Sequence, residues 1–347
     1  MADILKNLKE KYLVLFDGNG AEGTATAMQV LPGPKPTSLK NNGFSRPGYI
    51  FRGWNTKPDG SGKTFQNRAT VDGNATKGQL KLYAIWEPEL TKKPLTGKPI
   101  LHMVPSQNPS LFVSAQGFCL ASNEKNAYAA CCFVRNTPKY NAGDDSDYNS
   151  SVVLYQVKTG KMVAHADKLP LDHANSMCYD PKKQRFYICT LGNARKPGYI
   201  YELDWHMKVT NKILPKKATH VGAMAWYKDQ YIGLLPVGHG KYTFVTMDSN
   251  FQVLNQTGII HGYDANYISQ GIAVDDKYIY NVACDFDDSH WEKHQRVHVY
   301  DKATGKRRGM QTLAIPHEIE DLDIFGGKMY CNTNRQTACD VYLLSGK

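Results

Sequence analysis

Long apolar runs are absent from the sequence, and none approaches the roughly 18 residues that a membrane-spanning helix requires. The first six residues, MADILK, also lack the apolar centre of a signal peptide. These absences predict a soluble chain without membrane insertion, synthesised in the cytoplasm without a recognisable signal peptide.

Short motifs of catalysis and nucleotide binding are missing too. The sequence has no nucleophile elbow, no Walker loop, no GxGxxG that opens a helix and no HExxH. No catalytic residue can therefore be assigned from a motif. This weakens an enzymatic interpretation without excluding it, because some hydrolases assemble their sites from scattered residues.

The 8 Cys include no CxxC pair, and most of them lie inside apolar, strand-like runs. This pattern favours small buried thiols over a zinc site or a disulfide framework, and it suits a reducing compartment. Cys331 and Cys339 are the pair to check for a bridge across a hairpin.

Positive charge exceeds negative charge, and the formal net charge is +10. The first hundred residues carry 15 Lys and Arg against 8 Asp and Glu, so most of the excess lies there. Attraction to a polyanion is one interpretation, and a solvated surface is the other. The lysines are scattered through turns, which favours a solvated surface, and we expect no nucleic-acid partner.

Residues 1–11 have Ile4, Leu5 and Leu8 at helical spacing, which predicts a short helix or a docking segment. From residue 12 onward, short alternating runs are interrupted by Gly, Pro and Asn, which indicates strands and turns. Three segments stand out in this region: FDGNG at 16–20, RPGYIFRGW at 46–54 and LYAIW at 82–86.

In order and in residues, the segment 12–87 resembles the Listeria/Bacteroides repeat, also called the internalin B-type repeat, of surface and phage-encoded proteins. One departure is Ala21, where a second Gly is common. The resemblance implies a small β-grasp-like module with Trp54, Tyr49 and Trp86 in its core. It also implies a spacer or weak adhesive unit without known chemistry.

Residues 88–99 contain several prolines and few large apolar groups, which predicts a stiff linker. Beyond it, five segments align as a repeat, and their starts are 59, 47, 48 and 50 residues apart. The aligned segments are 116–120, 175–179, 222–226, 270–274 and 320–324. Each is followed by two further strand-like runs, and the first four units add a fourth.

This period, with four strands in each unit, is typical of a β-propeller blade. The last unit has three strands of its own, so we expect a strand near 99–104 to complete it and close the ring. The sequence therefore predicts an all-β chain, in which a β-grasp-like module is followed by a five-bladed β-propeller over 100–347.

Polar residues recur where the chain enters the innermost strand of each blade, on the face where propellers usually bind ligands. These candidates for an axial ligand site are Gln116, His173, Asn175, His220, Gln270, His317 and Glu320, and Glu318 lies beside them. The residues favour a metal or sugar site on the axis. Alternatively, each caps a strand or holds water in a polar channel, and no short motif supports a metal.

Two loops offer further candidates. The loop 135–151 carries Asp144, Asp145 and Asp147, and acidic oxygens at alternate positions could bind calcium. The Gly and final Glu of an EF-hand are missing, which favours a flexible solvated loop. His290 and Trp291 in the fourth unit would suit a sugar ring.

We expect a non-enzymatic structural and binding protein without a cofactor: a bacteriophage virion fibre, spike or decoration protein, or a surface adhesin. Its partners would be a host-surface glycan or protein and, through residues 1–11, other virion proteins. Release by lysis would reconcile a virion or extracellular location with the missing signal peptide. The alternative is a propeller glycosidase or lyase that acts on surface polysaccharide, with His173, His220, Glu318 or Glu320 as acid and base.

Overall fold

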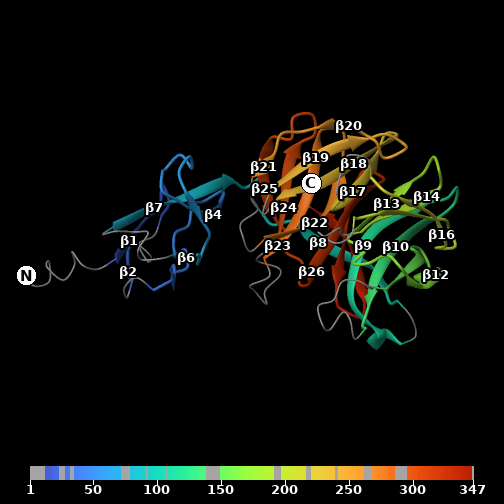
Figure 1. The fold of residues 1–347 in the computed structure, drawn as a ribbon. Helices are drawn as coiled ribbons and strands as arrows, with labels where there is room; N and C mark the ends of the chain where they lie inside the picture. The colour runs from blue at the N-terminus through green and yellow to red at the C-terminus, as the bar shows by residue number, and fades with distance from the viewer. Residues whose placement is uncertain are drawn as a thin grey trace, which may run out of the picture. The chain divides into compact units, whose positions relative to one another are not determined.

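The chain is built almost entirely of strands in the computed structural model (Figure 1). The structure describes residues 12–22, 28–31, 35–71, 79–90, 93–105, 108–137, 149–190, 197–215, 220–238, 241–261, 267–285 and 295–345. The chain divides into two compact units after residue 92. Within the described ranges, no helix is long and apolar enough to cross a membrane. The N-terminal segment 1–11, predicted as a helix or docking segment, lies outside them.

The first unit is built on a mixed sheet with the strand order β2-β1-β7-β4-β5. Its central strands β1 and β7 are parallel, whereas β2 and β4 pair with them antiparallel. The strands are β1 (Tyr12–Asp17), β2 (Met28–Leu31), β4 (Tyr49–Asn55), β5 (Thr64–Phe65) and β7 (Gln79–Pro88). A separate pair joins β3 (Thr37–Ser38) to β6 (Thr70–Val71). A parallel central pair with antiparallel neighbours is the β-grasp-like arrangement that was predicted.

Trp54 is the centre of the first unit's core, and its side chain is fully buried. Its ring lies 4.6 Å from that of Phe16 and 5.0 Å from that of Phe51, measured between centroids. Trp86 packs against the same cluster, and its indole N–H donates a hydrogen bond of 2.8 Å to the carbonyl of Gly18. Large aromatic side chains thus supply most of this small core.

Tyr49 does not belong to this core, contrary to what the repeat resemblance implies. Its side chain is 37% exposed. It is the first residue of β4 and pairs with Pro88 at the end of β7, where no further strand covers it. The Arg46 guanidinium lies 3.9 Å above the Tyr49 ring, so the ring is shielded by a cation instead of by the core.

The second unit contains five antiparallel sheets of four strands, and the third of these has one extra short strand. The first is β9 (Phe112–Ser122), β10 (Ala127–Arg135), β11 (Ser150–Gln156) and β12 (Lys161–Leu169). The second is β13 (Ser176–Asp180), β14 (Arg185–Cys189), β15 (Ile200–Leu203) and β16 (Val209–Ile213). The third is β17 (Ala223–Tyr227), β18 (Gln230–Gly238), β19 (Lys241–Met247) and β20 (Val253–Gln256), with β21 (Ile260–His261) beside β19.

The fourth sheet is β22 (Tyr267–Val274), β23 (Tyr278–Asp285), β24 (Arg296–Asp301) and β25 (Arg307–Thr312). The fifth is β26 (Glu318–Phe325), β27 (Lys328–Asn334), β28 (Cys339–Ser345) and β8 (Thr96–Met103). The first strands of the five sheets contact one another in the cyclic order β9, β13, β17, β22, β26 and back to β9. Radial sheets around a closed ring of inner strands form a β-propeller, which confirms the predicted fold.

The ring is closed by β8, which precedes the first sheet in sequence but forms the outer strand of the fifth. It pairs antiparallel with β28 from Met103 to Thr96, and the hydroxyls of Thr96 and Ser345 lie 2.8 Å apart. Just before it, Leu95 is buried and forms a parallel bridge to Leu313. The structured second unit therefore begins inside the segment 88–99 that the prolines predict as a linker.

Apolar clusters fill the spaces between neighbouring sheets of the ring, one cluster for each space. All 8 Cys are buried and unpaired. Cys331 lies in the cluster between the fourth and fifth sheets, and Cys339 lies in the cluster between the fifth and first. Because the two thiols are on opposite faces of one sheet, no bridge joins them.

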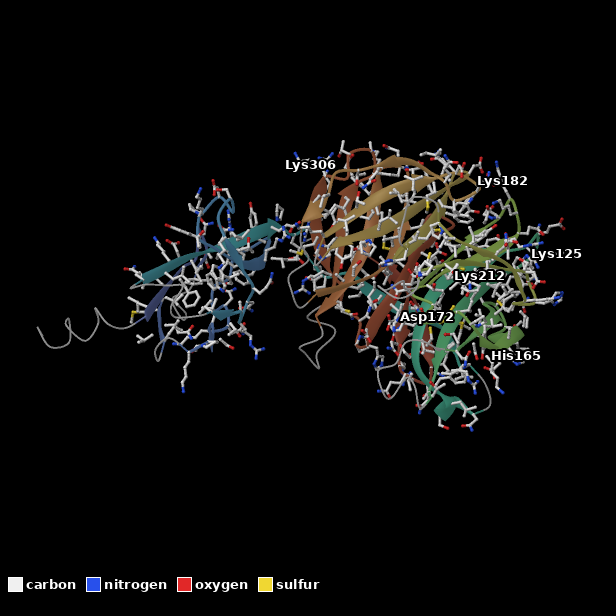
Figure 2. All side chains as sticks on the ribbon, viewed as in Figure 1. Lys125, His165, Asp172, Lys182, Lys212 and Lys306 are labelled. Atoms are coloured by element: carbon white, nitrogen blue, oxygen red, sulfur yellow. The ribbon has the colours of Figure 1, made fainter. Side chains whose placement is uncertain are left out.

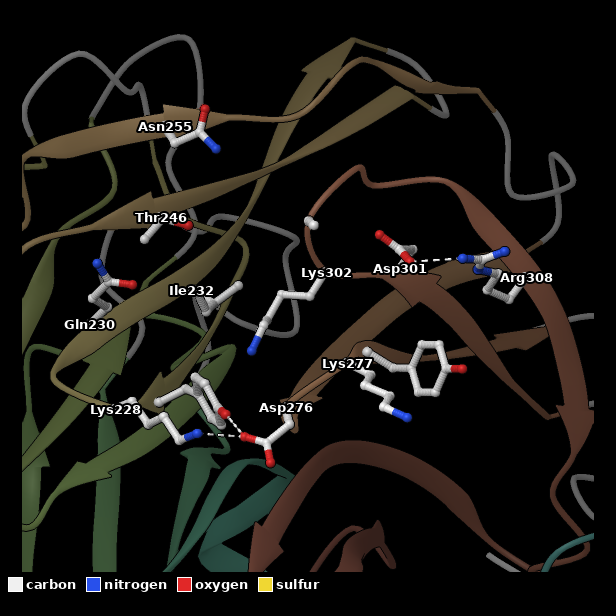
Figure 3. A pocket seen from close by; sticks show the side chains of 13 residues that line it. Lys228, Gln230, Ile232, Thr246, Asn255, Asp276, Lys277, Asp301, Lys302 and Arg308 are labelled. Carbon is white, nitrogen blue, oxygen red and sulfur yellow. Dashed lines mark hydrogen bonds and ion pairs between the residues drawn. The ribbon is translucent and has the colours of Figure 1, made fainter.

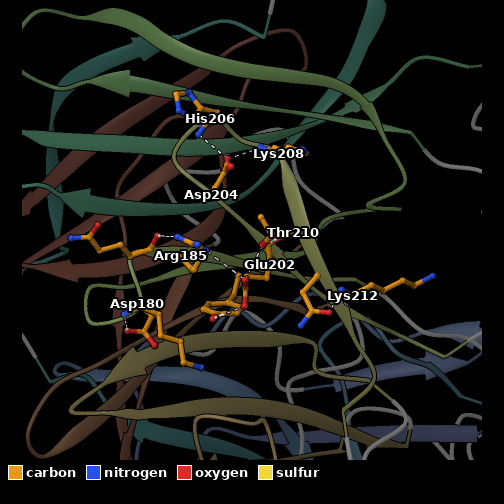
Figure 4. Close-up of polar contacts among 12 residues, drawn as sticks. Asp180, Arg185, Glu202, Asp204, His206, Lys208, Thr210 and Lys212 are labelled. Carbon is orange, nitrogen blue, oxygen red and sulfur yellow. Dashed lines mark hydrogen bonds and ion pairs between the residues drawn. The ribbon is translucent and has the colours of Figure 1, made fainter.

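Aspartates stabilise the turns at one end of the strands (Figure 4). Asp204 accepts hydrogen bonds from the backbone N–H groups of His206 at 2.9 Å and Lys208 at 3.0 Å. Asp180 accepts one from the N–H of Lys182 at 2.9 Å and one from the Tyr231 hydroxyl at 2.6 Å, which ties its turn to the next sheet. Such side-chain bonds fix tight turns and orient what they carry.

Candidate functional site

The axial candidates lie at one end of the ring, where the chain enters the first strand of each sheet. Gln116 in β9, Gln270 in β22 and Glu320 in β26 are buried. The other four are partly buried and stand just before a first strand: His173 and Asn175 before β13, His220 before β17 and His317 before β26.

Glu318, Glu320 and Asn334 form the centre of a polar group that we call the axial cluster. Its members are Ser114, Gln116, Gln270, Glu318, Glu320 and Asn334. The Asn334 amide nitrogen lies 3.1 Å from Glu318 Oε2 and 2.9 Å from Glu320 Oε1, so it donates toward both carboxyl groups. One amide thus holds two carboxyl groups side by side.

The two glutamines extend this cluster to neighbouring sheets. Gln270 Nε2 in the fourth sheet donates to Glu318 Oε1 at 3.4 Å. Gln116 Nε2 in the first sheet donates to Ser114 Oγ at 2.8 Å, and Asn334 Nδ2 donates to the same hydroxyl at 3.0 Å. Three of the predicted residues, Gln116, Gln270 and Glu320, are therefore brought into one site.

Burial dominates the electrostatics of the carboxyl pair. It raises the pKa of Glu318 above its usual range, because few water molecules can solvate the charge. Burial raises the pKa of Glu320 well above its usual range, and the neighbouring Glu318 charge raises it further. Both shifts favour the protonated form of the pair, in which a carboxyl group can donate a hydrogen bond as well as accept one.

Two oxygens of the axial cluster are buried without a hydrogen-bond partner in the described part of the chain: Gln116 Oε1 and Glu320 Oε2. Buried polar atoms normally have partners, and those that do not call for an explanation such as a water molecule, an ion or a polar ligand. Glu318 is only partly buried, so the cluster opens toward solvent at this residue.

Asp321 closes the axis beneath the cluster. Its Oδ2 accepts backbone hydrogen bonds from Phe118 at 3.1 Å and Met177 at 3.0 Å, which belong to the first and second sheets. Gly271 of the fourth sheet leaves room for this side chain, because a Cβ there would lie 1.6 Å from Asp321 Oδ1. Burial raises the pKa of Asp321 well above its usual range.

The three histidines lie outside the hydrogen bonds that define the axial cluster. His173 Nδ1 is 3.1 Å from the side-chain oxygen of Asn175, whose amide donates to the Gly222 carbonyl at 2.9 Å. The nearby charges of Arg335 and Asp340 act in opposite directions on the pKa of His317: Arg335 lowers it and Asp340 raises it. Burial lowers the pKa of all three imidazoles and favours their neutral form. Among the described residues, no group of three or more His, Cys, Asp or Glu side chains is arranged to hold a metal ion.

Ser114 and Asn334 are members of the cluster that the sequence reasoning missed. A signal for Asn334 exists, because Asn332 and Asn334 are two residues apart in a strand and share one face. Asn332 Nδ2 donates to the Gln116 carbonyl at 2.7 Å, so both amides point toward the first sheet. The loop candidates Asp144, Asp145, Asp147, His290 and Trp291 lie outside the described residues.

Comparison with protein families identifies the first unit. Residues 12–85 match the model of the Listeria-Bacteroides repeat domain. This confirms the resemblance of residues 12–85 to the Listeria-Bacteroides repeat, which was drawn from the three segments. No curated protein sequence matches the chain.

Solved structures resemble the chain in fold only. The β-propeller domain of the trilobed protease from Pyrococcus furiosus has a TM-score of 0.32 and 11% identity over 67% of this chain and 82% of that one. The Pan2 WD40 domain of Neurospora crassa has a TM-score of 0.37 and 9% identity over 75% of this chain and 98% of that one. An acylaminoacyl peptidase has a TM-score of 0.31 and 14% identity over 62% of this chain, but the match spans only 43% of that chain.

Proposed function

We propose that the five-bladed propeller is a non-enzymatic binding module that recognises a glycan through the axial cluster. The observation that carries this proposal is a pair of buried oxygens, Gln116 Oε1 and Glu320 Oε2, without a hydrogen-bond partner in the described residues. Sugar hydroxyls both donate and accept hydrogen bonds. A cluster of amides, one hydroxyl and two carboxyl groups offers both donors and acceptors to such a ligand.

We further propose that the whole chain is a host-binding protein of a bacteriophage virion, such as a fibre, spike or decoration protein, or a surface adhesin. The combination of a Listeria-Bacteroides repeat with a propeller supports an extended binding protein. Buried, unpaired cysteines are compatible with synthesis in a reducing cytoplasm before release. A host-surface glycan is the proposed ligand, and other virion proteins are proposed to bind residues 1–11.

One observation favours an enzyme as the second candidate. Glu318 and Glu320 both bond to Asn334 Nδ2, and burial raises the pKa of each carboxyl above its usual range. Retaining glycosidases place two carboxyl groups about 5 Å apart, one protonated and one ionised. A propeller glycosidase or lyase with this pair as acid and base would show the same arrangement.

The test is binding of the purified chain to polysaccharide extracted from Gram-positive cell walls and to intact cells. Glu318→Ala removes the acceptor of Gln270 and should weaken binding about tenfold, the equivalent of one hydrogen bond to a charged group, about 1.5 kcal/mol. The control is Glu202→Ala, a partly buried glutamate of β15 in the outer part of the second sheet. Equal binding by wild type and Glu318→Ala, or binding to no cell, would contradict the axial site. New reducing ends during incubation would select the enzymatic candidate.

A further inference from the structure

A pocket of about 640 Å³ lies at the other end of the propeller from the axial cluster. The strand β22 connects the two regions: Gln270 is the fourth of its eight residues, and the turn with Asp276 and Lys277 follows its end. The pocket is bordered by the third and fourth sheets (Figure 3). Four cationic side chains line it, Lys228, Lys277, Lys302 and Arg308, against two carboxylates, Asp276 and Asp301.

Two ion pairs link the turns of neighbouring sheets, and this pattern stops at Lys277. Lys182 pairs at 2.5 Å with Asp229 in the turn of the next sheet, and Lys228 pairs at 2.6 Å with Asp276 in the turn after that. Lys277 is the second residue of its turn, where the third sheet has Asp229, and the following turn has Gly326 and Gly327 instead of an aspartate. Among the described residues, none forms an ion pair with the exposed Lys277.

Lys302 is the second cation of the pocket that forms no salt bridge with a residue that the structure describes. Its ammonium lies 3.7 Å above the Tyr227 ring and donates a hydrogen bond of 2.8 Å to the Asp275 carbonyl. These contacts hold the side chain in the pocket while leaving its charge uncompensated by a salt bridge. By contrast, Arg308 is neutralised by Asp301 at 2.8 Å. The pocket therefore keeps a net positive charge at Lys277 and Lys302.

The opposite wall supplies neutral polar groups from the third sheet. Gln230, Thr246 and Asn255 line the pocket, and their side chains form no hydrogen bond within the described residues. Amide and hydroxyl groups bind sugar hydroxyls, and the ring of Tyr278 provides flat apolar surface. A charged corner beside a wall of this kind suits a saccharide unit that carries an anionic group.

We infer that this pocket binds an acidic sugar unit of a polysaccharide, with its anionic group at Lys277 and Lys302 and its hydroxyls at Gln230 and Asn255. The site is separate from the axial cluster and does not depend on the glycan-binding proposal made for it. Further lysines in turns would attract neighbouring acidic units of the same polymer, among them Lys125, Lys182 and Lys306 (Figure 2).

The experiment measures binding of trigalacturonic acid to the full chain by calorimetry at low salt. Its methyl ester is the neutral control ligand, and poly(glycerol phosphate) tests phosphate as the source of the anion. Lys277→Met and Lys302→Met should each weaken trigalacturonate binding about tenfold, as for loss of one charged hydrogen bond. The matched control is Lys328→Met at the exposed first residue of β27 in the fifth sheet, which does not line the pocket and should change binding less than twofold.

Weaker binding at higher salt and retained binding by Lys302→Arg would support the site, since both follow from charge. Tighter binding of poly(glycerol phosphate) than of trigalacturonate would also support it and would name phosphate as the anion. Equal affinity for the methyl ester, no binding of either anion, or equal losses in Lys328→Met and the two pocket variants would overturn the inference. Glu318→Ala should leave this binding unchanged, so failure at the axial cluster and failure here are distinguishable.

Discussion

At the scale of single residues, the most constrained position is Gly271. A methyl group there would lie 1.6 Å from Asp321 Oδ1 and 2.6 Å from Asp321 Cα, which is backbone and cannot move alone. Asp321 accepts backbone hydrogen bonds from the first and second sheets. A displaced Asp321 side chain would therefore destabilise these bonds as well as its contact with residue 271. Gly271→Ala should lower the free energy of unfolding by about 2–4 kcal/mol, as overpacking and a lost buried network do.

Urea denaturation measures this change. Gly258→Ala is the matched control, because a Cβ at Gly258 would have no atom within 4 Å. Its unfolding free energy should stay within about 0.5 kcal/mol of wild type, as is usual for surface substitutions. Equal stability of Gly271→Ala and Gly258→Ala would show that the axis is not packed as described.

Glu320 gives a prediction on pH. Its folded-state pKa is raised by burial and by the Glu318 charge, whereas an unfolded glutamate titrates near about 4.3. Its favourable contribution to stability is therefore complete below about pH 4 and is lost as pH rises through the folded pKa. Glu320→Gln keeps the acceptor for Asn334 and removes the titration. The difference in unfolding free energy between variant and wild type should shift in favour of the variant from pH 4 to pH 7, and a constant difference would refute the assignment.

The sequence predicted part of the axial cluster because its repeat aligns equivalent positions. Gln116, Gln270 and Glu320 share one place in their blades, so a ring brings them together. Asn334 has no counterpart of this kind and enters the cluster from the end of β27. The histidines were predicted by the same alignment, but loop geometry before each first strand decides where their side chains point, and periodicity does not encode it.

At the scale of elements, strands and turns follow the sequence closely. The FDGNG turn shows why: Asn19 adopts a φ of 49°, which asparagine tolerates, and its N–H bonds to Asp17 Oδ1 at 2.9 Å. Its side-chain amide donates to the Ala84 carbonyl at 2.9 Å, which fixes the turn against β7. Short-range chemistry of this kind is readable from sequence, whereas the exposure of Tyr49 depends on where the sheet ends.

The outer strand of the fifth sheet gives a prediction on fragments. A fragment 93–347 should fold cooperatively, because it contains every strand of the second unit. A fragment 105–347 lacks β8, exposes the edge of β28 and removes the buried Met103 and Leu101. It should aggregate or melt at a lower temperature by 10 °C or more, roughly the effect of losing several kcal/mol. Circular dichroism and light scattering can compare the two fragments. Equal melting temperatures would contradict a stabilising role of β8 in closing the ring.

At the scale of the whole molecule, a stiff linker at 88–99 implies that residues 1–88 fold independently of the propeller, and this stays a prediction. The fragment 1–92, compared with the same segment in the full chain, tests it by melting, and an unfolded fragment would argue against the boundary. The net charge of the chain said less about the pocket than the positions of the individual lysines do. The excess in the first hundred residues was visible in the composition, but the unpaired Lys277 and Lys302 depend on which turns lack an aspartate and on how the sheets pack.

Closure by β8 also sets an order of events during translation. β8 leaves the ribosome before any other strand of its unit, yet its partner β28 is made last, and the hydrogen bond between Thr96 and Ser345 spans 249 residues. Until then the nascent chain is an open arc with unpaired edges at both ends, a state that chaperones protect from misassembly. A ribosome that stalls within the fifth repeat would therefore release an arc that cannot close, because the partner strand of β8 has not been made.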